Sequence, residues 1–461
     1  ARMQVFGSSG VRGVAGDELT PRYVLRVAQA AGAVWREDHD RVAIARDTRT
    51  TGRTFTNAAT AGLTGVGFDV DRLGVVPTPG LQAYCEREGV PGVMITASHN
   101  PPAYNGVKLV GHGGVELTRS TLDRIETALR EDDPAYANWE TVGADTAIES
   151  ARRRYREQLL ASVDRDKIAD ADLTVVVDPG HGAGSLTSPE LFRELGCEVH
   201  TVNAQPDGRF PGRNPEPVAE NLADLRALVR STDADLGFAH DGDADRAMFV
   251  DETGTHVEGD AALAALAAAK LEAGDSVVSA VNASQRLVDV VEDAGASLSL
   301  TPIGSTYIVS RIRNLQTEGA HVAIAGEGNG GILFPDYRIA RDGAFTAAKF
   351  LELVADRPAS DIAAAYDDYH NVRRNLHYET EGEREAMLDG IESYAREATA
   401  DLDTTDGYRL DYGDGWVLAR PSGTEPVVRV YAEARTPDRA AELAETMVDR
   451  ATRDVETYTE E

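Results

Sequence analysis

Four loops of this sequence hold residues whose types and spacing are suited to chemistry, and the first is TASHNPPAYNGVKL at 96–109. In this loop Ser98 stands beside His99, and Lys108 follows later. Two consecutive prolines restrict the backbone after the serine, so we expect a stiff loop. A hydroxyl next to an imidazole and an amine has the ingredients of an activated nucleophile or a phosphate carrier. The alternative is a rigid turn in which Ser98 only hydrogen-bonds to the backbone. The serine does not lie in a GxSxG motif, so the loop does not indicate a hydrolase.

The second loop, HDGDADRAMFVDE at 240–252, follows an apolar strand. Asp241, Asp243 and Asp245 alternate in it, so their carboxylates can converge on one hard cation. Acids at this density repel one another unless a cation lies between them. A calcium loop would need glycine where Arg246 stands, and its flanks would be helices rather than strands. The loop therefore predicts a divalent cation site with Mg²⁺ as the preferred ion, and a solvated run of charge is the alternative.

The third loop, GEGNGG at 326–331, follows the apolar run VAIA and leaves its backbone open. Only Glu327 and Asn329 offer polar side chains in it. A carboxylate can accept hydrogen bonds from sugar hydroxyls, and an amide can donate or accept them. These residues alone leave a sugar site and a glycine-rich turn without function equally open.

The fourth loop, ARPSGTEPVVRVY at 419–431, combines guanidinium groups with hydroxyls and a flexible backbone. These groups capture phosphate through bidentate charge-assisted bonds and backbone N–H donors. In a chain of net charge −31, such a basic loop favours an anion site over a structural turn. The candidate phosphate ligands are Arg420, Ser422, Gly423, Thr424 and Arg429.

Short apolar strands that alternate with amphipathic helical stretches must position these loops. RVAIARD at 41–47 and GVMITAS at 92–98, for example, lie on either side of a helical region. Near-continuous Val, Ile and Ala strands joined by helices predict parallel sheets covered on both faces, with ligands beyond the carboxyl ends of the strands. The C-terminal part differs, because a GDG turn precedes the strand-like run at 427–434 and predicts an antiparallel α+β domain.

Shifts in composition and turn-rich segments place domain boundaries near residues 150, 255 and 372. Each predicted domain then carries one of the four loops. The predicted domains are 1–150 with the serine loop, 151–255 with the aspartate loop, 256–372 with the glycine-rich loop and 373–461 with the phosphate loop.

The composition excludes several classes of protein. Of 461 residues 42% are hydrophobic and 27% charged, as in folded proteins, and no apolar run approaches the roughly 18 residues of a membrane span. Acidic residues number 77 against 46 basic ones, so we expect neither nucleic acid nor membrane as a partner. Only four basic residues are lysines, and dispersed acids with little lysine predict a halophilic protein, with an ordinary acidic enzyme as the alternative. Two cysteines and the lack of a signal-like segment predict a cytoplasmic protein.

The four loops, in this order, resemble those of the α-D-phosphohexomutase family, which includes phosphoglucomutases, phosphomannomutases and phosphoglucosamine mutases. The resemblance covers essentially the whole chain, through FGSSGVRG, TASHNP, DGDADR, GEGNGG and RPSGTEP. It implies three similar α/β domains with mixed, mostly parallel sheets plus a smaller C-terminal α+β domain around a central cleft. The implied partner is a small-molecule hexose phosphate, and we expect a monomer or a homodimer.

The resemblance also implies a role for each loop. Ser98 would carry a phosphoryl group, donate it to a hexose phosphate to form a 1,6-bisphosphate, and take back the other phosphate, so that hexose 1,6-bisphosphate acts as an activator. Lys108 is the candidate general acid–base group. Glu327 and Asn329 would hold the sugar O3 and O4, and the fourth loop would hold the phosphate that does not react. The implied catalytic residues are Ser98, His99, Lys108, Arg12 and Arg246, and the implied Mg²⁺ ligands are Ser98, Asp241, Asp243 and Asp245.

The third loop departs from the GEMSGH pattern of many bacterial relatives, because Asn329 replaces the serine and Gly331 the histidine. Ser305 and Thr306 stand where relatives often carry a basic residue or histidine. The identity of the base is therefore left open. The GEGNGG variant resembles archaeal-type members, and we expect conversion of glucosamine 6-phosphate to glucosamine 1-phosphate. A mannose or glucose phosphate is the alternative substrate, and a sugar-phosphate phosphatase or a non-catalytic sugar-phosphate-binding protein is a more remote alternative.

Overall fold

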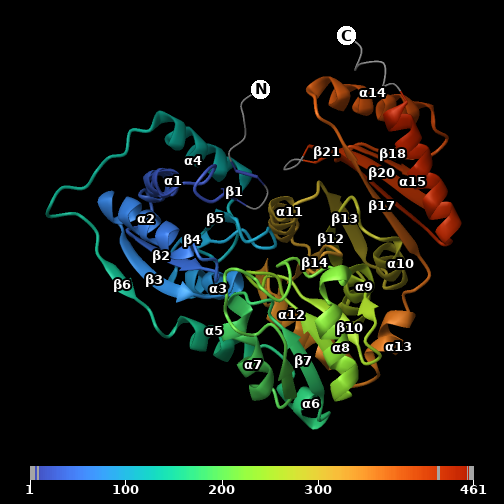
Figure 1. Cartoon of the computed structure of the whole chain (residues 1–461), viewed down its shortest axis with the longest axis horizontal. Helices are drawn as coiled ribbons and strands as arrows, with labels where there is room; N and C mark the ends of the chain where they lie inside the picture. The colour runs from blue at the N-terminus through green and yellow to red at the C-terminus, as the bar shows by residue number, and fades with distance from the viewer. Residues whose placement is uncertain (1–5, 8–9, 423–425, 454, 456–461) are drawn as a thin grey trace.

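The computed structural model describes residues 6–7, 10–422, 426–453 and 455, which form four sheets with helices packed on them (Figure 1). We call the parts built on these sheets domains I to IV, in chain order. In Figure 1 the colour of domain I runs from blue to teal and that of domain IV from orange to red, and domains II and III have the colours between these.

Domain I contains six strands in the spatial order β1-β5-β4-β2-β3-β6. The central strand β2 pairs parallel with β3 and β4, whereas β5 runs antiparallel to β4 and β1. The strands are β1 (Val11–Val14), β2 (Arg41–Arg46), β3 (Asp69–Val75), β4 (Gly92–Ile95), β5 (Tyr104–Val110) and β6 (Asp145–Ala147), and the helices are α1 (Pro21–Trp35), α2 (Gly52–Gly65), α3 (Thr78–Glu88) and α4 (Arg119–Glu131).

The sheet of domain I is buried on both faces because alternate residues of its strands enter different cores. In β2, Val42 and Ile44 pack into a core with α1, α2 and α4. Ala43 and Ala45 point the opposite way, into a core that includes Leu81 of α3. Successive side chains of a strand point to opposite faces, so a continuous apolar run is what a doubly covered strand requires.

Domains II and III each contain five strands, in the orders β11-β10-β9-β7-β8 and β13-β12-β14-β15-β16. The strands of domain II are β7 (Thr174–Asp178), β8 (Glu198–Thr201), β9 (Leu236–Ala239), β10 (Met248–Asp251) and β11 (His256–Val257), and its helices are α5 (Ala151–Leu160), α6 (Arg165–Asp170), α7 (Ser188–Glu194) and α8 (Ala223–Thr232), with 3₁₀ turns η1 (Ala183–Leu186) and η2 (Ala219–Asn221). The strands of domain III are β12 (Ser276–Ala280), β13 (Ser297–Thr301), β14 (Val322–Gly326), β15 (Ile332–Phe334) and β16 (Arg338–Arg341), and its helices are α9 (Gly259–Lys270), α10 (Gln285–Asp293), α11 (Ser305–Thr317), α12 (Gly343–Val354) and α13 (Ala359–Ala364).

The three α/β sheets share one topology, and it places the candidate loops at equivalent positions. In each sheet a central strand (β2, β7 or β12) pairs parallel with a neighbour on either side. The neighbour that comes later in the sequence then forms an antiparallel hairpin with the strand that follows it. These hairpins are β4–β5, β9–β10 and β14–β15. The serine, aspartate and glycine-rich loops are the turns of these three hairpins, so each begins where a parallel strand ends.

Domain IV is an antiparallel sheet in the order β17-β21-β20-β19-β18, with both of its helices in one core. The fourth loop joins β20 to β21. The elements are β17 (His370–His377), β18 (Asp401–Asp403), β19 (Tyr408–Asp411), β20 (Gly415–Pro421), β21 (Val427–Ala434), α14 (Glu381–Glu397) and α15 (Pro437–Thr452). Three domains with mixed sheets and a C-terminal antiparallel domain confirm the fold class expected from the sequence.

The cores show how the domains are joined. Domains II and III share one hydrophobic core, in which Phe249 of β10 stacks on Phe350 of α12 with ring centroids 4.2 Å apart. Domain IV has a core of its own, and a small apolar cluster that includes Val281 of domain III and Trp416 and Leu418 of domain IV lies between the two.

Candidate active site

The serine loop of domain I meets the aspartate loop of domain II. The buried Ser98 Oγ donates a hydrogen bond of 2.6 Å to Asp241 Oδ2. The backbones approach closely as well, because a Cβ on Gly242 would lie 2.7 Å from the Ser98 carbonyl oxygen. Only glycine fits at this contact, so its small size allows the two loops to touch.

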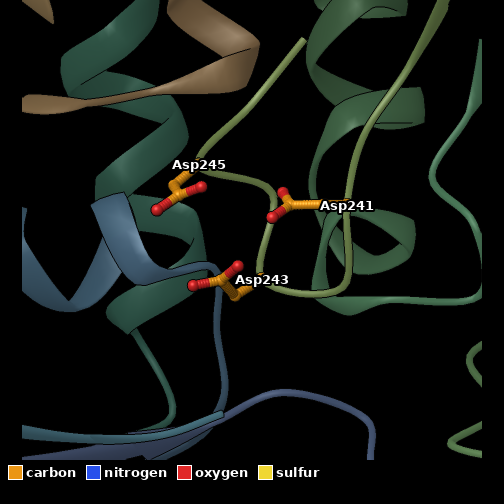
Figure 2. A group of neighbouring side chains, drawn as sticks. All are labelled: Asp241, Asp243 and Asp245. Carbon is orange, nitrogen blue, oxygen red and sulfur yellow. The ribbon is translucent and has the colours of Figure 1, made fainter. Parts of the chain in front are cut away.

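The three aspartates of the second loop form one cluster. Asp241, Asp243 and Asp245 are fully buried, and one carboxylate oxygen of each lies within 4.8 Å of the others. Figure 2 shows the three side chains pointing toward a common point. Among the described side chains, Asp243 Oδ1 and Asp245 Oδ1 are buried without a hydrogen-bond partner. Oxygen atoms arranged in this way fit a hard divalent cation such as Mg²⁺.

The pKa values of the cluster reflect crowding of like charges. Burial and the charges of Asp243 and Asp245 raise the pKa of Asp241 to about 8. The pKa of Asp243 lies well below its usual range in spite of burial, because Lys108 Nζ lies 2.8 Å from Oδ2 and Thr78 donates a 2.6 Å bond to the same oxygen. Without a cation, the crowded carboxylates therefore disfavour ionisation of Asp241, and a bound cation would remove that penalty.

Cationic side chains surround the aspartate cluster. Lys108 contacts Asp245 at 3.2 Å as well as Asp243, and these carboxylates raise its pKa although burial opposes the shift. Arg341, at the end of β16, lies 2.7 Å from Asp245 Oδ2. Arg246 Nε lies 4.0 Å from Asp241 Oδ2. These groups are placed to balance the carboxylates and to attract a phosphoryl group.

Arg12 and His99 complete the surroundings of Ser98. Arg12, on β1, donates a 2.7 Å hydrogen bond from Nη1 to Asn100 of the serine loop, and burial lowers its pKa to about 10, so it stays charged at neutral pH. His99 Nδ1 lies 3.3 Å from Ser98 Oγ. Burial and the nearby charges of Arg246 and Arg12 hold the pKa of His99 far below its usual range, so its imidazole is neutral.

The glycine-rich loop lies beside the same arginine that contacts the aspartate cluster. Glu327 is 8% exposed, and Asn329 Nδ2 donates to its carboxylate at 3.5 Å. Asn329 Oδ1 accepts the backbone N–H of Gly331 at 3.0 Å, which closes the turn. A Cβ on Gly331 would lie 2.7 Å from Arg341 Cδ. The missing imidazole at this position thus leaves room for the arginine that bonds to Asp245.

The hydroxyl pair at the start of α11, Ser305 and Thr306, is bound by domain I. Ser305 Oγ donates to Glu116 Oε2 at 2.9 Å, and Thr306 Oγ1 donates to the same oxygen at 3.3 Å. The position where relatives often carry a basic residue is therefore linked through an acid to the domain that carries Ser98.

The phosphate loop is described in part, since Gly423 and Thr424 lie outside the described residues. Arg420 and Arg429 are direct partners across β20 and β21, so both guanidinium groups belong to one end of the hairpin. Arg420 Nε lies 2.9 Å from Asp406 Oδ2, and the backbone N–H of Ser422 donates to the carbonyl of Val427 at 2.8 Å.

The sequence did not single out two side chains that contact the cluster, Thr78 and Arg341. Thr78 begins α3 in the segment PTPG, and Arg341 is one of many arginines. Neither lies in one of the four candidate loops. Their proximity to the site depends on the folding of distant segments. The only signal in the sequence is that Thr78 comes shortly after the strand β3 and that Arg341 ends the strand β16.

Models of one protein family match most of the chain. The family is described as phosphoglucomutase/phosphomannomutase, and its alpha/beta/alpha domains I, II and III match residues 3–135, 153–254 and 258–369, with its C-terminal domain at 372–450. The chain belongs to this family. The phosphohexomutase resemblance drawn from the loops is thereby confirmed, and with it the assignment to an enzyme of the isomerase class.

Individual relatives agree with this assignment. The phosphoglucomutase/phosphomannomutase of Thermococcus kodakarensis is 39% identical over 96% of this phosphohexomutase and 97% of its own chain. A "probable phosphoglucosamine mutase" of Methanopyrus kandleri is 41% identical over 98% of both chains. The crystal structure of a phosphoglucomutase/phosphomannomutase family protein from Burkholderia thailandensis has a TM-score of 0.85 at 27% identity over 98% of both chains. An Aspergillus fumigatus N-acetylphosphoglucosamine mutase, solved with GlcNAc-6P and magnesium, shares the fold at a TM-score of 0.62 and 16% identity, over 97% of this chain and 95% of its own.

Membrane insertion through a helix finds no support in the fold. Among the residues that the structure describes, none of the helices combines the length and the apolar character that a bilayer crossing requires.

Proposed function

We propose that this phosphohexomutase moves a phosphoryl group between O6 and O1 of a hexose phosphate through a phosphoserine at Ser98 and a hexose 1,6-bisphosphate. The observation that carries the proposal is the 2.6 Å contact of Ser98 Oγ with Asp241 in a buried cluster of three carboxylates. A serine hydroxyl at a cation site that excludes water is suited to hold a phosphoryl group and pass it on.

In the first transfer the bond between phosphorus and Ser98 Oγ breaks, and a bond to the free sugar hydroxyl forms. Mg²⁺ held by Asp241, Asp243, Asp245 and the phosphoserine would supply charge neutralisation of the transferring group. Ser98 Oγ gains a proton as it is released, and the attacking sugar hydroxyl gives up its proton as its oxygen bonds to phosphorus. We assign the donation to Ser98 Oγ to Lys108, whose amine is then recharged by the proton from the sugar hydroxyl, so no net proton is released. The ion pairs of Lys108 with Asp243 and Asp245 keep its amine charged, which is the form that an acid needs.

The arginines and His99 act on the phosphoryl group itself. Arg12 and Arg246 would bind its oxygens, since both guanidinium groups lie beside the serine or aspartate loop. The neutral imidazole of His99, 3.3 Å from Oγ, would orient the hydroxyl without adding charge.

Two loops would bind the rest of the substrate. Glu327 and Asn329 would accept and donate hydrogen bonds to O3 and O4 of the sugar. The hairpin with Arg420, Ser422 and Arg429, together with Gly423 and Thr424, would hold the phosphate that does not react. After the first transfer the bisphosphate turns around, so the same hairpin would bind either phosphate, and its binding energy would orient the reacting end.

We propose glucosamine 6-phosphate as the preferred substrate. Support comes from several archaeal relatives at 36–41% identity that are named phosphoglucosamine mutase. The relative from Thermococcus kodakarensis, at 39% identity, is named phosphoglucomutase/phosphomannomutase and favours mannose or glucose phosphate as the second candidate.

The test is mutase activity on the 6-phosphates of glucosamine, mannose and glucose, with Mg²⁺, molar KCl and a trace of glucose 1,6-bisphosphate. We expect the highest kcat/KM for glucosamine 6-phosphate and near-complete loss of turnover in Ser98→Ala. The matched control is Ser162→Ala, which removes an exposed hydroxyl just after α5 that donates to the carbonyl of Gln158. Release of inorganic phosphate in place of isomerisation would support the phosphatase alternative. Full mutase activity in Ser98→Ala would refute the phosphoserine.

A further inference from the structure

The serine loop is held in place by a buried side chain of domain I, that of Arg49. Arg49 follows the central strand β2, and its side chain is completely buried. Its Nε donates to Asp47 Oδ2 at 3.1 Å, and the backbone N–H of Arg49 donates to Asp47 Oδ1 at 2.9 Å. The Asp47 carboxylate thus binds both the guanidinium group and the backbone N–H of Arg49, and this fixes the direction of the side chain.

The remaining donors of Arg49 all bind carbonyl groups of the serine loop. Nη2 donates to Ser98 O at 2.9 Å and to Asn100 O at 2.6 Å. Nη1 donates to Pro101 O at 2.7 Å and to Tyr104 O at 2.9 Å. A guanidinium group has five N–H donors in a rigid plane, and here every one is used. A lysine has three donors on one atom and cannot reach the same four carbonyls.

The loop that Arg49 holds has a backbone conformation that needs support. Ser98 has φ +51°, in the left-handed region that non-glycine residues seldom adopt. Its backbone N–H donates to Thr96 Oγ1 at 2.8 Å, and the same hydroxyl donates to Asp47 Oδ2 at 2.7 Å. Thr96, itself bound by Asp47, therefore holds the amide of the strained residue, and Arg49 holds its carbonyl.

Domain II closes over this cluster. The ring of Phe210, from a loop of domain II, lies over the guanidinium of Arg49 with its centroid 5.1 Å from Cζ. Gly208 packs on the backbone at 48–50, and Thr48 Oγ1 donates to the His181 carbonyl at 2.8 Å. The fork that holds Ser98 thus lies between the domain that carries the serine and the domain that carries the aspartates.

We propose that Arg49 is a positioning residue that sets Ser98 Oγ against the aspartate cluster for phosphoryl transfer. The role rests on the proposed function, because Arg49 acts through Ser98 and touches no substrate. A displacement of about 1 Å in a reacting group costs on the order of 100-fold in rate. Loss of the fork should therefore lower kcat and leave KM unchanged, since the groups proposed to bind the substrate lie in other loops.

The experiment compares Arg49→Lys with Arg338→Lys. Arg338 is a matched control, because it is equally buried, pairs with Glu86 at 2.9 Å and lies over Tyr337. We expect both variants to lose a similar amount of thermal stability. In Arg49→Lys alone we expect kcat to fall about 100-fold with KM within about twofold, and amide hydrogen exchange at 98–104 to accelerate.

The outcomes separate this role from the proposed function. Unchanged exchange at 98–104 in folded Arg49→Lys, or a kcat within about threefold of wild type, overturns the positioning role. An equal loss of kcat in Arg338→Lys overturns it as well. A wild-type protein without mutase activity overturns the proposed function, and faster exchange confined to 98–104 would still support Arg49 as the support of this loop. If Arg49→Lys does not fold, Thr96→Val cuts the hydroxyl between Asp47 and the Ser98 amide, and a smaller loss of kcat at constant KM is expected.

Discussion

Two parts of the site are built in opposite ways. One is the reacting end, formed by the serine and aspartate loops, and the other is the phosphate hairpin, formed by β20 and β21 of domain IV. At the reacting end, Ser98 and the three aspartates are buried, and an ion pair stands behind each loop. Arg49 binds the serine loop, and in domain II Arg213 pairs with Asp178 at 2.9 Å and donates to the carbonyl just before Asp241 at 2.6 Å. Both acids lie at the end of a central strand, so the same device supports both loops.

The phosphate hairpin belongs to a domain that has a hydrophobic core of its own. Arg420 is ion-paired within domain IV, to Asp406, and Asp406 also accepts the backbone N–H of Ile303 from domain III at 3.0 Å. Domain IV packs on domain III through a small apolar cluster instead of the continuous core that joins domains II and III. Under the proposed function, burial would fix the geometry around Ser98, and a domain with its own core would bind the distal phosphate.

The largest loss of activity should come from a substitution in the aspartate cluster at the reacting end. Asp243→Asn keeps the shape of the side chain but removes a carboxylate charge that faces both the proposed cation and Lys108. We expect Mg²⁺ binding, measured by titration calorimetry, to be lost, and kcat to fall about 1,000-fold because several kcal/mol of charge stabilisation disappear. Asp251→Asn, at a buried acid of β10 whose bonds stay within its own turn, is the control. Normal Mg²⁺ affinity in Asp243→Asn would contradict the metal assignment.

A smaller effect of a different kind is expected at the hairpin. Arg420→Ala removes a guanidinium proposed to bind the distal phosphate, and a hydrogen bond to a charged group contributes about 1.5–3 kcal/mol. We expect KM for hexose phosphate and for the bisphosphate to rise about 10- to 100-fold in steady-state assays. Arg439→Ala, on α15 and paired with Asp414, should leave KM unchanged. A fall in kcat at constant KM would mean that this hairpin shapes the reacting end, and the contrast between the two regions would fail.

The junction of domains III and IV offers a way to loosen the hairpin without touching it. Glu433 is buried on β21 and accepts 2.6 Å hydrogen bonds from Ser284 Oγ and from the backbone N–H of Gln285, where α10 begins. A carboxylate at a helix N-terminus is favourable, so Glu433→Gln should weaken this junction by about 1–2 kcal/mol. We expect faster hydrogen exchange at 281–287 and around Trp416, with exchange at 98–104 unchanged. Faster exchange in the serine loop would show that the two regions are coupled.

Salt concentration should have the smallest effect, and this effect should be on the thermal stability of the whole protein. With 77 acidic and 46 basic residues, the folded chain repels itself at low ionic strength, and the Debye length falls from about 10 Å at 0.1 M salt to about 3 Å at 1 M. We expect the Tm, measured in thermal unfolding scans, to rise by about 5 °C over this range of KCl. A Tm that is independent of KCl would remove the support for a halophilic protein.

Much of the fold could be predicted because it depends on local patterns. Residues 42–45, 92–95 and 236–239 are continuous apolar runs within strands, and a run of that kind can only be stable when both faces of its sheet are covered. The candidate loops could be found for the same reason. Each follows such a strand, and its polar side chains contrast with the apolar residues before it.

The supporting arginines could not be predicted in this way. Arg49 and Arg213 bind mostly backbone carbonyls, which carry no sequence signature, and the carbonyls held by Arg49 lie about 50 positions farther along the chain. Arg341 reaches Asp245 from another domain, through the space that the absence of a side chain at Gly331 leaves. In a chain whose basic residues are nearly all arginines, the residue type did not distinguish these three.

The sequence by itself determined which groups are available and on which side of each sheet they emerge. Strand periodicity decides the buried faces, and polar residues after a strand have to lie at its carboxyl end. Only the tertiary structure decided which of these groups meet. Ser98 contacts Asp241 because two hairpin turns from different sheets are packed together at Gly242, and the guanidinium forks behind them depend on distances between segments that no local pattern encodes.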